Sequence, residues 1–192
     1  MKNISKLLGT VAGLLTLFLL TSALPPIKTK SIDLKASKIA WKGYKVTGEH
    51  YGSIKFKSGA LEFSGNTLNG GYFVIDMNTI NTEDLSGEYK NKLDGHLKSD
   101  DFFGVKQHPE ATLKFTKVTP KGNDYVIEGD LNIKGKSNPV TFNMTVHKSH
   151  AKAEFAIDRT LYNIKYGSAS FFDNLKDRAI SNDFDIEVDL VF

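Results

Sequence analysis

The sequence predicts an all-β fold, an antiparallel barrel or sandwich of about eight strands with one helix-bearing insertion. Three observations support this prediction. Apolar and polar residues alternate over most of the chain after residue 31. Turn signals containing Gly and Asn recur at intervals of roughly 8–12 residues. A single longer stretch has helical rather than alternating spacing, and it interrupts the strand pattern.

The alternating segments are the expected strands. In residues 53–57 and 184–190 every second residue is apolar, which gives a strand one apolar and one polar face. Turn signals such as Ser58-Gly59 and Asn69-Gly70-Gly71 separate neighbouring strands. The candidate strands are residues 37–47, 51–57, 60–63, 71–77, 111–118, 124–134, 139–147, 151–157 and 183–191.

The interruption lies between residues 82 and 99. Leu85, Tyr89, Leu93 and Leu97 recur there at every fourth position. This spacing predicts a helix with one apolar stripe, which has to lie against the sheet or across its end. A second short piece of helical or irregular structure is expected at residues 168–179.

The N-terminus has the pattern of a cleavable export signal. Lys2 and Lys6 precede an apolar run of 14 residues, and the small residues Thr21-Ser22-Ala23 favour cleavage near Ala23. A transmembrane helix needs roughly 20 apolar residues, and an uncleaved N-terminal anchor is the alternative. We therefore expect a periplasmic or secreted protein without a permanent membrane anchor, organised as signal peptide 1–23, N-terminal tail 24–34 and barrel domain 35–192.

Composition and motifs exclude several classes of function. The 25 Lys and Arg residues are balanced by 22 Asp and Glu residues, so the chain lacks the basic excess of a nucleic-acid-binding protein. The absence of Cys excludes disulfides, zinc fingers and thiol catalysis. No His-x-x-x-His pair and no Gly-x-Ser-x-Gly motif occurs. We expect no catalytic residue, metal or cofactor, and therefore no enzyme.

The predicted inward faces are almost wholly apolar, which leaves two hypotheses. An eight-stranded closed sheet either is filled by its side chains or holds one small ligand. The first hypothesis is a barrel that holds a hydrophobic ligand. The second is a filled barrel that acts as a structural or protein-interaction module, with the helix-bearing insertion docking a partner. The sequence leaves the oligomeric state open, a homodimer included.

Candidate ligand-binding residues follow from the alternation and from one loop. The expected lumen wall consists of Phe56, Phe63, Phe115, Phe142, Met144 and Phe155, with Trp41 at the rim or floor. The connection between the expected strands 151–157 and 183–191 contains three further candidates, the cations Arg159, Lys165 and Arg178. They could contact an anionic head group at the mouth of the barrel.

Several separated motifs resemble the YceI-like family. They are His96-Leu97-Lys98-Ser99-Asp100-Asp101-Phe102-Phe103, His108-Pro109-Glu110-Ala111-Thr112-Leu113-Lys114-Phe115, Gly129-Asp130-Leu131-Asn132-Ile133-Lys134-Gly135 and Val140-Thr141-Phe142. They occur in the family's order and spacing, and the resemblance spans residues 35–192. It implies an exported lipocalin-like barrel whose lumen binds a long polyisoprenoid, such as an isoprenoid quinone or a polyprenyl compound. It brings no established catalytic machinery.

The resemblance and the apolar inward faces lead to one expectation. The chain is expected to hold a polyisoprenoid in its lumen for transport, storage or sequestration. Burial of apolar surface is non-directional and contributes about 25 cal/mol per Å², so a long tail gains affinity with little polar recognition.

Overall fold

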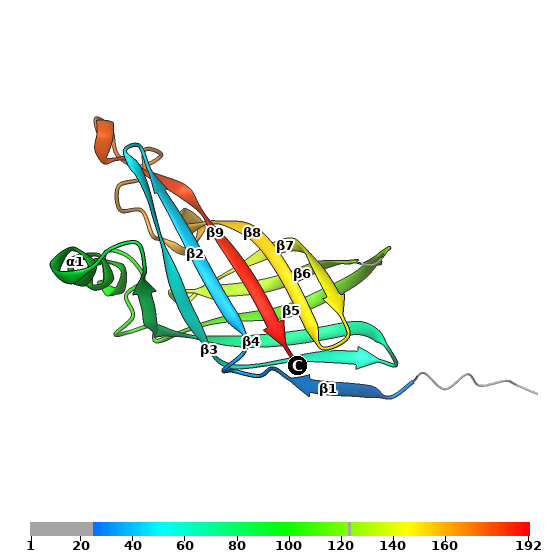
Figure 1. The fold of residues 1–192 in the computed structure, drawn as a ribbon. Coiled ribbons are helices and arrows are strands. Elements are labelled where there is room, and N and C mark those ends of the chain that lie inside the picture. Colours follow the sequence, from blue (N-terminus) through cyan, green and yellow to red (C-terminus); the bar gives the residue numbers. More distant parts are fainter. Residues whose placement is uncertain (1–24, 123) are drawn as a thin grey trace, which may run out of the picture.

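The computed structural model describes residues 25–122 and 124–192 (Figure 1). The predicted signal peptide, residues 1–23 with cleavage near Ala23, lies outside the described residues. Among the helices of the described ranges, none is long and apolar enough to span a membrane.

Strands dominate the part of the chain that the structure describes. The strands are β1 (Ile27–Ser31), β2 (Lys38–Lys45), β3 (Gly48–Ser64), β4 (Thr67–Thr82), β5 (Glu110–Lys121), β6 (Asp124–Ile133), β7 (Lys136–His147), β8 (His150–Asp158) and β9 (Ile180–Val191). Helix α1 (Gly87–Lys98) follows β4, and the 3₁₀ helices η1 (Arg159–Tyr162) and η2 (Lys176–Arg178) lie between β8 and β9. The irregular structure predicted at 168–179 is confirmed by η2 and its flanking turns.

The sheet closes on itself. Its strand order is β1-β3-β2-β9-β8-β7-β6-β5-β4, and β3 also pairs with β4. The β3–β4 pairing closes the strands from β2 through β9 into a ring of eight antiparallel strands. The predicted antiparallel barrel is therefore confirmed, and the sandwich is excluded. Closure gives every strand of the ring a neighbour on both sides, and it surrounds the interior with inward side chains.

Residues 24–34, predicted as a tail, contain a strand. β1 pairs with the second half of β3, from Ile27 opposite Ser64 to Ser31 opposite Ala60. The 17-residue β3 is much longer than the 8-residue β2, which pairs only with its first half. The remaining edge of β3 would expose unpaired backbone groups, and β1 covers it.

The turn predicted at Ser58-Gly59 is wrong, because β3 runs through it without a break. The register against β4 shifts between Phe56 and Ser58, which marks a β-bulge. A Cβ on Gly59 would lie only 2.5 Å from the Phe73 ring. Gly59 therefore provides room for that ring rather than a chain reversal.

Helix α1 is shorter than predicted and docks differently. It starts at Gly87, after the N-cap Ser86, and Tyr89 of the expected apolar stripe is 74% exposed. Leu97 is buried, but polar contacts provide much of the docking. Lys90 Nζ donates to the Thr82 carbonyl at 2.7 Å, and an Asp94 carboxylate oxygen accepts from the Thr82 amide at 2.8 Å. The predicted apolar stripe is therefore wrong at the N-terminal end of the helix, where Tyr89 faces solvent instead of the sheet.

The core lies inside the barrel, as the alternation predicts. On β9, Asp185 and Glu187 are exposed, whereas Leu190 is 1% exposed. The inward residues of β9 and of the other barrel strands form one apolar cluster. On β9 the alternation in the sequence therefore matches the alternation between core and solvent.

Candidate functional site

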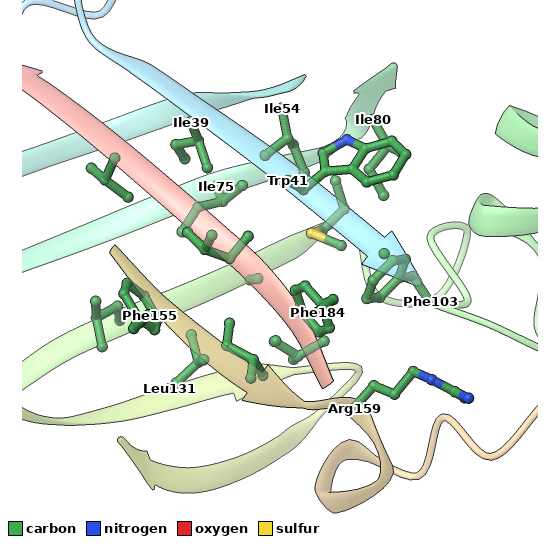
Figure 2. A pocket seen from close by; sticks show the side chains of 18 of the residues that line it. Ile39, Trp41, Ile54, Ile75, Ile80, Phe103, Leu131, Phe155, Arg159 and Phe184 are labelled. Carbon is green, nitrogen blue, oxygen red and sulfur yellow. The ribbon is translucent and has the colours of Figure 1, made fainter. Parts of the chain in front are cut away.

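An apolar cavity of about 170 Å³ lies inside the barrel (Figure 2). All eight strands of the ring contribute to its wall, and Leu97, Phe102 and Phe103 cover it on the side of α1. An engineered apolar cavity of about 150 Å³ is large enough to bind benzene and stays free of water. The inward side chains thus leave space for an apolar ligand, which argues against the filled-barrel hypothesis.

Almost all of the surface exposed to this cavity is apolar, and the lining residues with polar side chains lie at one end. The lining residues that carry a hydroxyl, carboxylate or guanidinium group are Tyr44, Arg159, Ser181 and Asp183. They come from the end of β2, from the junction of β8 with η1, and from the start of β9, where Asp158 pairs with Asp183. This end, which we call the mouth, is the place where a polar head group would meet the protein.

Trp41 forms part of the cavity wall, and its indole ring lies among the aliphatic side chains of Ile54 and Ile80 in Figure 2. Its Nε1 donates to the Ser53 carbonyl at 3.2 Å, which fixes the ring. Opposite Trp41 on β3 stands Gly52, where a Cβ would lie 2.8 Å from the indole and 1.9 Å from the Asn81 carbonyl oxygen. The position of the indole therefore depends on a glycine.

A row of five phenyl rings runs through the core beside and along the cavity. Centroid distances are 5.7 Å for Phe56–Phe73, 5.7 Å for Phe73–Phe115, 6.0 Å for Phe115–Phe142 and 4.5 Å for the stacked pair Phe142–Phe155. Four of the rings line the cavity, and Phe115 packs behind it between Phe73 and Phe142. Four members of this row, Phe56, Phe115, Phe142 and Phe155, are residues that the sequence predicts as lumen wall, and the structure brings them together.

The remaining predicted wall residues take different places. Met144 lines the cavity and is 3% exposed. Phe63 is buried but lies outside the cavity wall, with its ring centroid 5.6 Å from that of Phe192 and Lys30 Nζ 4.9 Å above it. A ligand-contacting role for each of these residues stays a prediction.

Arg159 is the buried cation of the mouth. It is 1% exposed, and its guanidinium donates to the carbonyls of Ser181 at 2.8 Å, Ile164 at 2.8 Å and Ile180 at 3.1 Å. These bonds tie η1 and the segment after it to the start of β9. The guanidinium has five N–H groups, so two remain for a ligand or water.

No carboxylate among the described residues forms an ion pair with Arg159. Burial lowers the pKa of its guanidinium, opposed by the nearby charge of Asp158, and an arginine stays charged at any physiological pH. The Tyr44 hydroxyl at the same mouth donates to Asp185 at 2.5 Å, and this bond raises the pKa of Tyr44 to about 12. Arg159 is therefore a buried positive charge beside this end of the cavity.

The sequence matches the YceI-like domain over residues 31–192. This range includes only the last residue of β1, Ser31, but every strand of the ring. The chain belongs to the YceI-like domain family. The resemblance based on the four motifs is thereby confirmed.

Bacterial relatives match part of this YceI-like domain. A UPF0312 protein of Pectobacterium carotovorum is 34% identical over 90 residues, 47% of this chain and 45% of the relative. Protein YceI of Escherichia coli is 40% identical over 63 residues, 33% of this chain and 32% of the relative. The aligned parts thus span less than half of each of these relatives.

Solved structures share the fold. BcnA of Burkholderia cenocepacia superimposes with a TM-score of 0.67 at 21% identity, covering 84% of this chain and 99% of that protein. A polyisoprenoid-binding domain from Saccharophagus degradans superimposes with a TM-score of 0.56 at 17% identity, covering 83% of this chain and 95% of that domain. Both likenesses support the barrel architecture.

The other two predicted head-group residues of the YceI-like domain do not line the cavity. Lys165 and Arg178 are exposed, on the segment that connects η1 to β9. Lys165 Nζ lies 4.6 Å from the centroid of the exposed Phe171 ring. Of the three cations, only Arg159 enters the mouth, and a head-group role for all three stays a prediction.

Sequence reasoning missed several wall residues. Phe73, Met77 and Ile80 of β4 line the cavity, as does Phe103. Phe73 and Met77 share the parity of the predicted strand 71–77, so their placement could have been inferred from it. Phe103 follows α1 in a loop, where no periodicity indicates direction. No group of three or more His, Asp or Glu residues in ranges 25–122 and 124–192 is placed to hold a metal ion.

Proposed function

We propose that this protein binds a polyisoprenoid-type lipid, with the apolar tail inside the barrel and the polar head at Arg159. The single observation that carries the proposal is the apolar cavity with one buried cation at its mouth. The family match and the polyisoprenoid-binding domain of the same fold support the choice of ligand.

The chemistry of the cavity suits a hydrocarbon that carries one acceptor group. The wall buries a tail without requiring specific polar contacts, at about 25 cal/mol per Å² of apolar area. The two guanidinium N–H groups of Arg159 that have no protein partner can donate to a quinone carbonyl or a phosphate oxygen. Together these features orient the ligand with its tail inward and its head toward the mouth.

The size of the cavity limits how the tail is bound. A volume of about 170 Å³ corresponds to a ring or one isoprene unit, by comparison with the roughly 150 Å³ cavity that holds benzene. A longer tail requires side chains of the wall to change rotamer. Phe103 and Phe184 are half-buried, with centroids 6.3 Å apart in an edge-to-face contact, and we propose that they move to admit it.

We also propose that the protein is exported and holds its lipid for transport, storage or sequestration outside the cytoplasm. The N-terminal basic residues, apolar run and small residues before Pro25 support export. A lipid tail has negligible solubility in water, so a soluble carrier with an apolar lumen fits a compartment between membranes.

The proposal is tested by identifying what the protein carries. Protein recovered in soluble form from its own host is analysed by native mass spectrometry and by solvent extraction. We expect a bound hydrophobic molecule with a prenyl fragmentation pattern. The variant Ala153→Leu places extra side-chain volume in the cavity wall, and it should reduce the bound fraction at least tenfold.

Ala156→Leu is the matched control, because Ala156 lies on the same strand but is exposed. It should carry as much ligand as the wild type. The proposal is contradicted if the protein is recovered empty and takes up no prenyl compound in vitro, or if both leucine variants lose ligand equally.

A further inference from the structure

Two adjacent phenylalanines are exposed on the segment between η1 and β9. Phe171 and Phe172 are 47% and 49% exposed, and the nearby Tyr166 is 47% exposed. The amides of both phenylalanines donate to the Ser168 carbonyl, at 3.1 and 3.0 Å, so a tight turn carries the two rings. Exposed aromatic side chains gathered on one short segment are typical of an interaction surface.

Cations surround these rings. Lys165, Lys176 and Arg178 are exposed on the same segment, and Lys165 Nζ lies 4.6 Å from the Phe171 centroid. Lys45 is adjacent in space, because the next residue, Val46, donates its amide to the Ala179 carbonyl. Lys45 and residues 163–179 together carry four cations and two acids, whereas the other described residues together have one more acid than cations. This region therefore carries a net charge of +2.

The segment is attached directly to the mouth of the cavity. The Ile180 amide donates to the Gly167 carbonyl at 2.8 Å, and the hydroxyl of the fully buried Ser168 donates to Asn182 at 2.6 Å. Ile180 and Ser181 line the cavity. In Figure 1 the segment, drawn in orange, extends beyond the barrel at the end opposite β1. The segment that carries the phenylalanines is therefore attached to the end of the cavity at which Ile180 and Ser181 lie.

We propose that this rim patch, defined as Lys165, Tyr166, Phe171, Phe172, Lys176 and Arg178, docks the protein onto a bilayer containing anionic lipids. The aromatic rings enter the interfacial region while the cations contact lipid phosphates, which is the combination that peripheral membrane contacts use. Docking in this orientation places the mouth against the membrane, so that a lipid passes into the lumen without crossing water. The purpose of docking rests on the proposed function, but the contact itself does not.

Vesicle flotation tests the proposal. Soluble protein recovered after expression of the full chain is mixed with vesicles of phosphatidylcholine alone or of phosphatidylcholine with phosphatidylglycerol. We expect the wild type to float with the anionic vesicles, and the double variant Phe171→Ser/Phe172→Ser to lose at least tenfold in apparent partition coefficient. Removing the charges of Lys165, Lys176 and Arg178 by Gln should weaken anionic-vesicle binding by about fivefold per cation, with little effect on neutral vesicles.

The matched control removes exposed apolar side chains elsewhere. Ile27 and Tyr72, 58% and 46% exposed on β1 and β4, are replaced by Ser in a second double variant that should float like the wild type. Wild-type protein that does not float, or a Phe171→Ser/Phe172→Ser variant that floats equally well, would overturn the proposal. A change of oligomeric state in that variant without a change in flotation would also overturn it, since the patch would then bind a second copy.

The two proposals fail separately. Ligand uptake from detergent solution reports the lumen alone, and the Phe171→Ser/Phe172→Ser variant should keep the wild-type affinity there. Its rate of uptake from vesicles should fall in proportion to the loss of docking. Normal uptake from detergent without vesicle binding contradicts only the docking surface, whereas vesicle binding without uptake contradicts only the lipid-binding lumen.

Discussion

The guanidinium carbon of Arg159 lies 5.6 Å from the centroid of the Phe102 ring, and both side chains line the cavity. Phe102 belongs to the loop after α1, and Arg159 begins η1. The contact therefore joins two segments that are far apart in the sequence, at the point where a ligand head group would enter. An arginine over an aromatic face is held by electrostatic attraction to the ring, which positions the guanidinium without neutralising it.

Arg159 is expected to stabilise the fold as well as to bind ligand. In Arg159→Ala the carbonyls of Ile164, Ile180 and Ser181 lose their donor, and we expect the free energy of unfolding in urea to fall by about 2–4 kcal/mol. Arg159→Lys keeps the charge but lacks the planar set of donors, so its loss should be roughly half as large. An alanine variant as stable as the wild type would show that these bonds contribute nothing.

Gly52 is expected to be indispensable for strand pairing. In Gly52→Ala the new methyl group would lie 1.9 Å from the Asn81 carbonyl oxygen and 2.8 Å from the Trp41 ring, so β3 has to separate from β4. We expect destabilisation of about 3 kcal/mol or more, measured by thermal or urea unfolding. Gly43→Ala is the control, because no atom lies within 4 Å of a Cβ at Gly43. Equal effects of the two substitutions would contradict this role.

The docking of α1 should depend on acidic pH through Asp94. Burial alone would raise the pKa of Asp94, but hydrogen bonds from Lys90 and Thr82 outweigh it and hold the pKa below its ordinary value of 3.8. Because the folded-state pKa is the lower one, the stabilisation is complete above about pH 4 and disappears as the pH falls through the folded-state value.

Urea unfolding across a pH series measures this effect. Asp94→Asn should cost about 1–2 kcal/mol at neutral pH, and the difference from the wild type should shrink steadily below about pH 4. Asp130→Asn, at an exposed position of β6, should show no such dependence. A difference for Asp94→Asn that stays constant with pH would mean that its carboxylate charge is not involved.

Ligand affinity should depend on tail length. Each CH₂ group that enters the wall contributes up to about 0.8 kcal/mol, so affinity should increase steeply over the first isoprene units and level off once the admitted tail fills the lumen. Titration calorimetry with prenyl compounds of increasing length and constant head group measures the trend. Equal affinity at every length would assign binding to the head group alone.

The barrel follows from the sequence because strand parity is a local property. Phe142 and Met144 stand two residues apart and face the lumen as the alternation requires. The β1 strand escapes prediction because its pairing depends on the length of β3, a partner about thirty residues away. Tyr89 fits an apolar stripe by its spacing, yet it is exposed to solvent. Its exposure depends on how α1 is oriented against the sheet, and no local sequence pattern encodes that orientation.

The candidate site is predictable in its wall and less so in its mouth. Phe56, Phe142 and Phe155 come from regular strands, and the structure places them around the cavity. The sequence predicts Arg159 as a cation in a loop, but its burial depends on the carbonyl of Ile164 after η1 and on those of Ile180 and Ser181 at the start of β9. Loop residues such as Phe103 have no period, so only the tertiary structure places them.

The central claim is that the lumen takes up an apolar ligand, and Trp41 can report this directly. It is the single Trp of the chain and forms part of the cavity wall. Titration of delipidated protein with a prenyl quinone should change the Trp41 emission saturably at one ligand per chain, and Ala153→Leu should weaken that response while Ala156→Leu does not. Emission that stays constant at every ligand concentration, with an unchanged melting temperature, would contradict the claim.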